Sequence, residues 1–182
     1  MSKNNLYFAY GSNLNQQDLE EWRKENPEYA DVDLKFNKVT NAYLPAFRLG
    51  FTRKSKMARR QYMGVADVVP SDDPLSRVWG AIYELTEEQL EKIDHYEGYR
   101  KDRDPKKNFY NRLQVEVVDK RGVKQACLTY QAEVGDEKKR KCLYHRPCEQ
   151  YCEVMRKGGE DHGLAKEFFE HLKVASVTER NP

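Results

Sequence analysis

Short runs of apolar and aromatic residues, separated by turn-forming residues, recur along most of the chain. The first run, residues 6–10, stops at Gly11 and is typical of a buried strand. The same pattern predicts six further strands, one early in 34–52 and the others at 47–51, 62–69, 78–85, 110–119 and 124–132. The last two flank a glycine-containing turn at 120–122, so they predict a hairpin.

Helix signals alternate with these strands. The best-marked helix covers residues 86–96, where Thr86 and Gln89 have the spacing of a capping box and Gly98 is a natural end. Asn13 or Asn15 predicts the cap of an earlier helix that runs to about residue 25. Two more helices are expected at 147–157 and 164–173.

The Gly158-Gly159 pair is expected to separate those last two helices, and the residues from 174 onward are expected to fray. Seven strands and four helices in 182 residues predict one α+β domain over 1–182, with its core at about 6–172. A domain of this size can form a stable hydrophobic core without disulfide bonds or bound metal ions.

Composition narrows the class of protein. Charged residues make up 34% of the chain and the mean hydropathy is −0.97, but 12% aromatic residues argue against disorder. A net charge of +2 does not demand a nucleic-acid partner. Because the chain has no apolar run of about 18 residues and a polar start, we expect a soluble, cytoplasmic protein without a membrane partner.

The four cysteines fit a reducing compartment. A zinc site can be written from Cys142, His145, Cys148 and Cys152, but this spacing matches no common ligand pattern. Reduced thiols are the simpler interpretation. We therefore expect no metal and no cofactor.

The junction Tyr10-Gly11-Ser12-Asn13-Leu14 is the first candidate for chemistry. A strand ends there and a helix begins, so backbone N–H groups and the helix dipole favour an anion or oxyanion site. Its spacing matches neither a Walker loop nor GxGxxG. An ordinary capped strand–helix junction explains the same pattern.

Glu97 is the second candidate. It shares one helix face with Leu90 and Ile93, so a carboxylate is placed along an apolar stripe. Burial and the negative end of the helix dipole both raise the pKa of such a carboxyl, as general acid–base chemistry at neutral pH requires. The alternative is a glutamate that turns into water at a helix end.

Together these segments resemble the signatures of the gamma-glutamylcyclotransferase family, also called AIG2-like. The first signature is Tyr7-Phe8-Ala9-Tyr10-Gly11-Ser12-Asn13-Leu14, and the second is Val78-Trp79-Gly80-Ala81-Ile82-Tyr83 followed by Asp94-His95-Tyr96-Glu97-Gly98-Tyr99. Further matches are 64–69, Tyr110, Tyr151, Gly158 and Gly163. The resemblance covers roughly residues 6–172.

The resemblance implies a small mixed β-barrel of about five to seven strands with flanking helices. It implies release of 5-oxoproline from a small γ-glutamyl substrate, with Glu97 as general acid and base. The substrate-binding residues would be Tyr7, Phe8, Ala9, Tyr10, Gly11, Ser12, Asn13, Tyr110 and Tyr151. Dimerisation is common in that family, so a homodimer is a further expectation.

Some features depart from the family pattern or leave alternatives. The charged link 100–107 is longer than usual, which leaves the register of Tyr110 open, and Ala165 and Phe168 stand where Pro and Tyr are frequent. The basic segments 53–60 and 100–107 either favour an acidic or phosphorylated leaving group or are solvated loops.

Three other functions compete with the housekeeping reaction. One is a specialised enzyme that removes a γ-glutamyl cap from a larger acyl amine, as in antibiotic biosynthesis. Another is a non-catalytic module of the same fold that binds a small ligand. A nucleic-acid reader that uses 53–60 is disfavoured by the nearly balanced charge.

Overall fold

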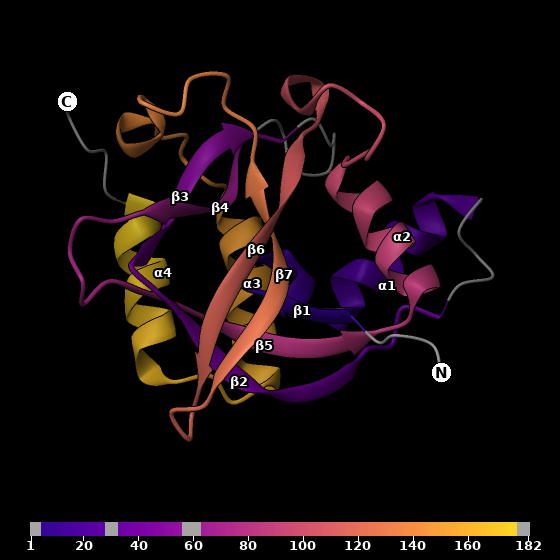
Figure 1. Cartoon of the computed structure of the whole chain (residues 1–182), viewed down its shortest axis with the longest axis horizontal. Coiled ribbons are helices and arrows are strands. Elements are labelled where there is room, and N and C mark those ends of the chain that lie inside the picture. Colours follow the sequence, from indigo (N-terminus) through magenta and orange to yellow (C-terminus); the bar gives the residue numbers. More distant parts are fainter. Residues whose placement is uncertain (1–4, 28–32, 56–62, 178–182) are drawn as a thin grey trace.

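Five strands close into a small barrel at the centre of the protein (Figure 1). The computed structural model describes residues 5–27, 33–55 and 63–177. In barrel order the strands are β1 (Asn5–Ala9), β5 (Arg77–Leu85), β2 (Asn37–Pro45), β6 (Tyr110–Asp119) and β7 (Lys124–Ala132). Neighbouring strands are antiparallel except β1 and β7, which run parallel where Tyr7 lies opposite Leu128. The expected mixed barrel is confirmed.

Two further strands form a separate sheet beside the barrel. β3 (Phe47–Lys54) pairs antiparallel with β4 (Gly64–Pro70). Ala46 lies between β2 and β3 with φ of 59°, and this left-handed backbone turns the chain out of the barrel. Six of the seven residues of β4 are buried, as its apolar sequence predicts.

Four α-helices flank the strands in the described part of the chain. They are α1 (Gln16–Glu25), α2 (Glu87–Glu97), α3 (Glu149–Asp161) and α4 (Lys166–Val177). Figure 1 shows α1 and α2 on the right of the barrel, α4 on the left, and α3 between them behind β6 and β7. Both hydrogen bonds of the predicted Thr86–Gln89 capping box are present, and Gly98 ends α2 with φ of 65°.

The start of the first helix differs in detail from the prediction. Residues Ser12–Leu14 form a short 3-10 turn, η1, and α1 begins only after it. Asn15 is the cap, because its side chain accepts hydrogen bonds from the backbone N–H groups of Gln17 and Asp18. The Gly11 junction therefore precedes a 3-10 turn and not the α-helix itself.

The prediction that Gly158 and Gly159 separate two helices is wrong. Both residues are buried inside α3. A Cβ atom on Gly158 would lie 2.7 Å from the Leu14 carbonyl carbon, and one on Gly159 would lie 2.4 Å from the Phe168 ring. The glycines are needed for close packing against η1 and α4, so a local helix-breaking signal is overridden.

The final helix is also longer than expected. α4 continues to Val177, so the prediction of fraying from residue 174 is wrong for residues 174–177. Tyr144 donates a hydrogen bond to the Ser176 carbonyl at 2.7 Å, which ties this last turn to the body of the protein.

Most of the predicted basic loop falls on residues 56–62, outside the described residues.

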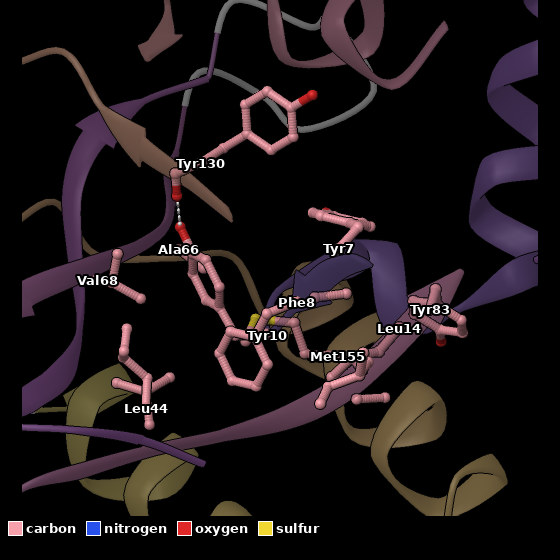
Figure 2. Close-up of a cluster of buried hydrophobic side chains, with 14 of the residues drawn as sticks. Tyr7, Phe8, Tyr10, Leu14, Leu44, Ala66, Val68, Tyr83, Tyr130 and Met155 are labelled. Carbon is pink, nitrogen blue, oxygen red and sulfur yellow. Dashed lines mark hydrogen bonds between the residues drawn. The ribbon is translucent and has the colours of Figure 1, made fainter. Parts of the chain in front are cut away.

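The core fills the barrel and the space between it and the helices. Tyr7, Phe8 and Tyr10 from the first strand region are buried together with Leu44, Val68 and Met155 (Figure 2). The Tyr10 hydroxyl donates a 2.6 Å hydrogen bond to the Tyr130 carbonyl. The buried Tyr10 hydroxyl therefore has a hydrogen-bond partner, as buried polar groups require.

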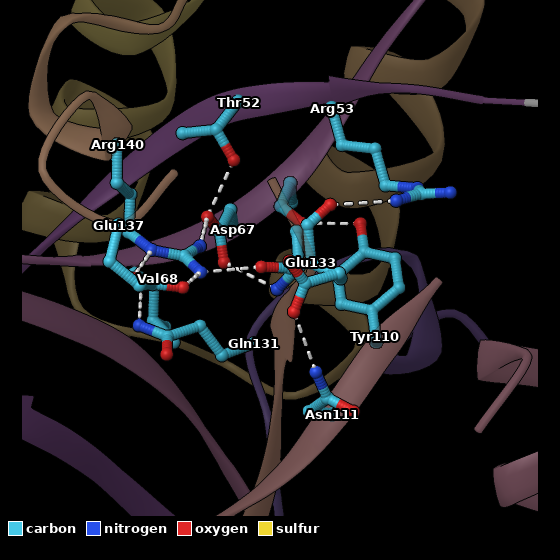
Figure 3. A network of polar contacts seen from close by, with 12 residues as sticks. Thr52, Arg53, Asp67, Val68, Tyr110, Asn111, Gln131, Glu133, Glu137 and Arg140 are labelled. Carbon is cyan, nitrogen blue, oxygen red and sulfur yellow. Dashed lines mark hydrogen bonds and ion pairs between the residues drawn. The ribbon is translucent and has the colours of Figure 1, made fainter. Parts of the chain in front are cut away.

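A buried ion pair between Asp67 and Arg140 lies where the β3–β4 sheet meets the end of β7 (Figure 3). The Asp67 carboxylate on β4 accepts hydrogen bonds from Arg140 Nη1 at 2.5 Å, Thr52 at 2.6 Å and the Ala132 backbone N–H at 2.9 Å. The side chains of Asp67 and Arg140 are 0% and 2% exposed. Burial raises the pKa of Asp67, and the charge of Arg140 and these hydrogen bonds oppose the rise.

We expect Arg140→Met to lower the free energy of unfolding by about 3–5 kcal/mol, because it leaves the Asp67 carboxylate buried without its cation. Chemical denaturation measures the loss. Lys124→Met is the control, since Lys124 and Glu116 form an exposed ion pair whose loss costs below about 1 kcal/mol. Equal losses in the two variants would contradict the role given to Arg140.

Gly158→Ala is expected to destabilise the protein by about 1–3 kcal/mol, because the new methyl group overlaps the backbone of η1. In an open helix interior the same change stabilises by about 1 kcal/mol. The sign of the change in denaturation midpoint therefore tests the close approach of α3 to η1.

Candidate active site

A cavity of about 320 Å³ lies where the barrel meets the β3–β4 sheet. Its volume is at the lower end of the roughly 300–1,000 Å³ of small-molecule sites. Most of the residues that the sequence predicted for the site line this cavity, namely Tyr7, Tyr10, Gly11, Ser12, Asn13, Glu97, Tyr110 and Tyr151. Segments that are far apart in the chain therefore meet around one small volume.

Phe8 and Ala9 do not line the cavity. Both are fully buried in the core, and Phe8 alternates with Tyr7 along β1. The Tyr7 side chain reaches the cavity, whereas Phe8 packs on the other side of the strand. The first signature therefore contains both cavity-lining and packing residues.

Glu97 and Asn13 form the polar centre of the site. Asn13 Nδ2 donates a 2.6 Å hydrogen bond to Glu97 Oε1 and a 2.7 Å hydrogen bond to the Tyr7 hydroxyl. Because a carboxylate only accepts, the amide nitrogen of Asn13 must face Glu97. The arrangement joins the first signature to the second across 84 positions of sequence.

The helix α2 fixes where Glu97 lies. Leu90 and Ile93 on the same face are 1% and 0% exposed, and Glu97 is half-buried at the last position of the helix. The left-handed Gly98 then turns the chain away. Both premises of the predicted rise in the Glu97 pKa, burial and a helix C-terminus, are thus present, and the rise itself stays a prediction.

A second set of hydrogen bonds holds the η1 turn in place. The Tyr96 hydroxyl donates to Asp18 Oδ2 at 3.2 Å and lies 3.1 Å from Ser12 Oγ. Since the Tyr96 proton is directed at Asp18, the Ser12 hydroxyl is the donor to Tyr96. All three residues are buried, so the turn that carries Ser12 and Asn13 is rigidly seated.

Tyr110 and Tyr151 brace the opposite wall. The Tyr110 hydroxyl donates to the Ala66 carbonyl at 2.7 Å, and the Tyr151 hydroxyl accepts from the Ala66 N–H at 3.1 Å. Tyr110 opens β6 opposite Ala132, which settles its register despite the long preceding link. Both peptide groups of Ala66 are therefore held by cavity-lining tyrosines.

The cavity tyrosines are neutral at physiological pH, and burial moves their pKa values further from it. Burial raises the pKa of Tyr7 and Tyr110 well above the usual value, and the negative charge of Glu97 acts in the same direction on both. At neutral pH these hydroxyls are therefore hydrogen-bond donors. In the described part of the chain, the hydrogen bond that the Tyr7 hydroxyl makes is the one it accepts from Asn13, which leaves its proton for a ligand.

Several cavity residues were not predicted from the sequence. They include Trp22, Arg53, Lys54, Val65, Ala66, Tyr96, Phe109 and Tyr130. Tyr96 lies inside the second signature and Arg53 inside a basic segment, so each had some signal. Trp22 and Tyr130 had none, because each reads as an ordinary core aromatic residue.

The structure does not assemble the zinc site that could be written from the sequence. In residues 5–27, 33–55 and 63–177 no three His, Cys, Asp or Glu side chains gather so that they could hold a metal ion. Cys127, Cys142, Cys148 and Cys152 are free thiols. Of the helices in the described segments, none is both long and apolar enough to cross a membrane.

Comparisons with known proteins agree with this geometry. The profile of the AIG2-like family matches residues 77–172, just over half of the chain. Gamma-glutamylcyclotransferase of Mus musculus is 27% identical over 175 residues, which cover 96% of this chain and 80% of that protein. The Homo sapiens protein of the same name is 27% identical over 170 residues, covering 93% and 77%.

The fold has close structural neighbours as well. A solved structure named gamma-glutamyl cyclotransferase superposes with a TM-score of 0.69 at 24% identity, over 99% of this chain and 92% of that one. The mixed barrel with a helix-end carboxylate beside a glycine turn thus defines a protein of the gamma-glutamylcyclotransferase fold. The chain belongs to the AIG2-like family.

Asn13→Asp is expected to raise the pKa of one carboxyl of the resulting pair by about one unit or more, because two carboxylates at this distance cannot both ionise freely. Carbon-13 NMR titration of the carboxyl groups measures the shift. Asn13→Leu removes the hydrogen bond without adding charge, so it should change the pKa of Glu97 less than Asn13→Asp does. Equal shifts in the two variants would contradict the contact.

Proposed function

We propose that the protein is a γ-glutamylcyclotransferase-type enzyme that releases 5-oxoproline from a γ-glutamyl amine or amino acid. The α-amino nitrogen of the substrate attacks its own γ-carbonyl carbon, and a new C–N bond closes the five-membered lactam. The original γ-amide C–N bond breaks, and the departing amine takes up the proton that the attacking nitrogen loses. The reaction is therefore an intramolecular acyl transfer.

Glu97 would carry the proton between the two nitrogens. As a carboxylate it accepts a proton from the attacking amine, and as a carboxylic acid it donates that proton to the leaving nitrogen. One group serves both steps because the two nitrogens are bonded to the same carbon in the tetrahedral intermediate. Proton transfer of this kind contributes about 10²–10⁴-fold to a rate.

The surroundings of Glu97 support this role. Half-burial and the helix C-terminus both raise the pKa of a carboxyl, whereas the Asn13 hydrogen bond favours the ionised form. Each of the two protonation states is therefore favoured by one feature of the site. A group that alternates between base and acid requires such a balance.

The glycine turn would bind the glutamyl head. Backbone N–H groups of Gly11, Ser12 and Asn13 at the first turn of η1 are suited to the α-carboxylate or the developing oxyanion. The Tyr7 hydroxyl proton is available as a further donor. One such donor is worth on the order of 10²–10³ in rate.

The cavity would also supply proximity. Tyr10, Tyr110 and Tyr151 form a rigid wall around a volume of about 320 Å³, which suits a folded glutamyl group better than an extended one. Holding the amine against the γ-carbonyl converts a flexible chain into a near-attack geometry, for which effective molarities reach about 10⁵–10⁸ M. Phe8 and Ala9 lie in the core and do not line the cavity, so we assign them no contact with the substrate.

The observation that carries this proposal is the Asn13–Glu97 hydrogen bond inside the tyrosine-lined cavity. It joins a carboxylate to a turn rich in hydrogen-bond donors. The proposed reaction needs both of these parts. Incubation with a panel of γ-glutamyl amino acids, amines and larger acyl amines, with detection of 5-oxoproline, tests the reaction. Release from none of them would favour a module that only binds its ligand.

We expect Glu97→Gln to reduce 5-oxoproline release by at least about 10²-fold, because the amide can neither accept nor donate the proton. Circular dichroism and ligand titration should show that fold and binding are retained. Glu88→Gln is the control, since Glu88 lies on the same helix and is exposed. Unchanged turnover in the Glu97 variant would show that the base is another group.

A further inference from the structure

A second cavity, of about 390 Å³, lies between β3, α4 and the loop that joins β4 to β5. Figure 1 shows that loop beside α4. Among the described residues, this cavity shares no lining residue with the candidate active site. Phe51 lines the second cavity, and its ring meets the ring of Tyr151, which lines the first, at 6.4 Å. The two cavities are therefore separate, with one layer of side chains between them.

The second cavity has an apolar wall that reaches the surface. Leu49 and Phe51 from β3 are 8% and 0% exposed and form its buried part. Leu75 and Val174 line it as well and are 75% and 55% exposed. Large apolar side chains that face water around a cavity are typical of a site for a ligand with an apolar body.

Three cations line the same cavity, namely Arg48, Arg77 and Lys141. The Cζ atom of Arg77 lies 4.7 Å from the centre of the Tyr43 ring, and Arg48 Nη2 donates to the Lys141 carbonyl at 2.7 Å. In the described segments no carboxylate lies within 4 Å of Arg77, whereas Lys141 pairs with Asp72 at 2.6 Å. A guanidinium that is oriented by a ring and has no carboxylate partner is suited to an anionic ligand.

The backbone of Arg77 is fixed by α4. His171 Nδ1 lies 3.1 Å from the Arg77 carbonyl, and because a carbonyl only accepts, this nitrogen carries the proton. The next residue of β5, Val78, is 2% exposed. The exposed side chain of Arg77 therefore extends from a rigid point of the fold.

The charges around the cavity favour a ligand with a single negative charge. Asp73 is the acidic residue that lines it, and its carboxylate accepts from the Leu75 N–H at 2.9 Å and the Ser76 hydroxyl at 3.4 Å. With Lys141 matched by Asp72, the two arginines exceed the Asp73 carboxylate by one positive charge. A monoanion balances this excess, whereas a dianion exceeds it.

We propose that this cavity is a second ligand site, which binds a small organic monocarboxylate with an apolar body. Arg77 would hold the carboxylate, and the wall around Leu49, Phe51 and Leu75 would take the apolar body. This inference does not depend on the proposed function, because the two cavities have separate linings.

The test compares 3-phenylpropionate with 3-phenylpropanamide, which has nearly the same shape but no charge. Titration of the ¹⁵N-labelled full chain, followed by NMR, gives the affinity of each probe and locates it. We expect the carboxylate to bind about tenfold more tightly, as for a charge-assisted hydrogen bond. Its shifts should gather at 48–51, 71–77 and 171–175, and added salt should reduce the preference.

Arg77→Met should remove most of the preference for the carboxylate, whereas Leu75→Ser should weaken both probes alike. Both side chains are exposed, so neither change removes a core contact. Arg53→Met is the matched control, because Arg53 also lies over a ring, that of Phe109 at 4.8 Å, but lines the active-site cavity. Its affinity for both probes should equal that of the unaltered protein.

Four results would overturn the proposal. The first is an absence of shifts up to about 10 mM of 3-phenylpropionate. The second is equal affinity for the acid and the amide, since the cavity would then be an apolar patch only. The third is a loss of binding in Arg53→Met but not in Arg77→Met, which would place the probe in the active-site cavity. The fourth is binding of 2-phenylethyl phosphate that is tenfold or more tighter, which would show selection of a dianion.

Discussion

The buried carboxylate of Asp67 is the constraint on which the site depends. The Asp67 carboxylate on β4 accepts hydrogen bonds from Thr52 on β3, from the Ala132 N–H at the end of β7 and from Arg140, so it ties the β3–β4 sheet to the barrel. The next residue back, Ala66, is held by Tyr110 and Tyr151. Because the cavity lies along this junction, a shift of β4 would open one wall and displace Arg53 with it.

Tyrosine hydroxyls have two separate functions in this small volume. Those of Tyr10, Tyr110 and Tyr151 engage backbone groups and so act as braces. The Tyr7 hydroxyl instead accepts from Asn13, which also donates to Glu97, so it belongs to the polar centre. Burial raises the pKa of Tyr7, Tyr10 and Tyr110 further above neutral pH, so the Glu97 carboxylate is surrounded by neutral hydroxyl groups.

Local signals predicted most of the fold. The strands Tyr110–Asp119 and Lys124–Ala132 and the capped helix α2 were found within a residue or so, because turn and capping residues act over three or four positions. The prediction for Gly158 and Gly159 is wrong because these residues act through long-range contacts. Their role is close approach to Leu14 and Phe168, which are distant in sequence, and a single sequence carries no sign of such contacts.

The sequence by itself determined most element types and, through the family resemblance of two segments, the mixed-barrel fold and the two segments that meet at the cavity. These features follow from periodicity, capping and two short motifs, all of which are local. Only the tertiary structure decided that Asn13 bonds Glu97, that Phe8 and Ala9 face the core, and that Arg53 lines the cavity. These outcomes depend on strand pairing and packing between distant segments, which are settled when the whole chain minimises its exposed apolar surface and unpaired polar groups.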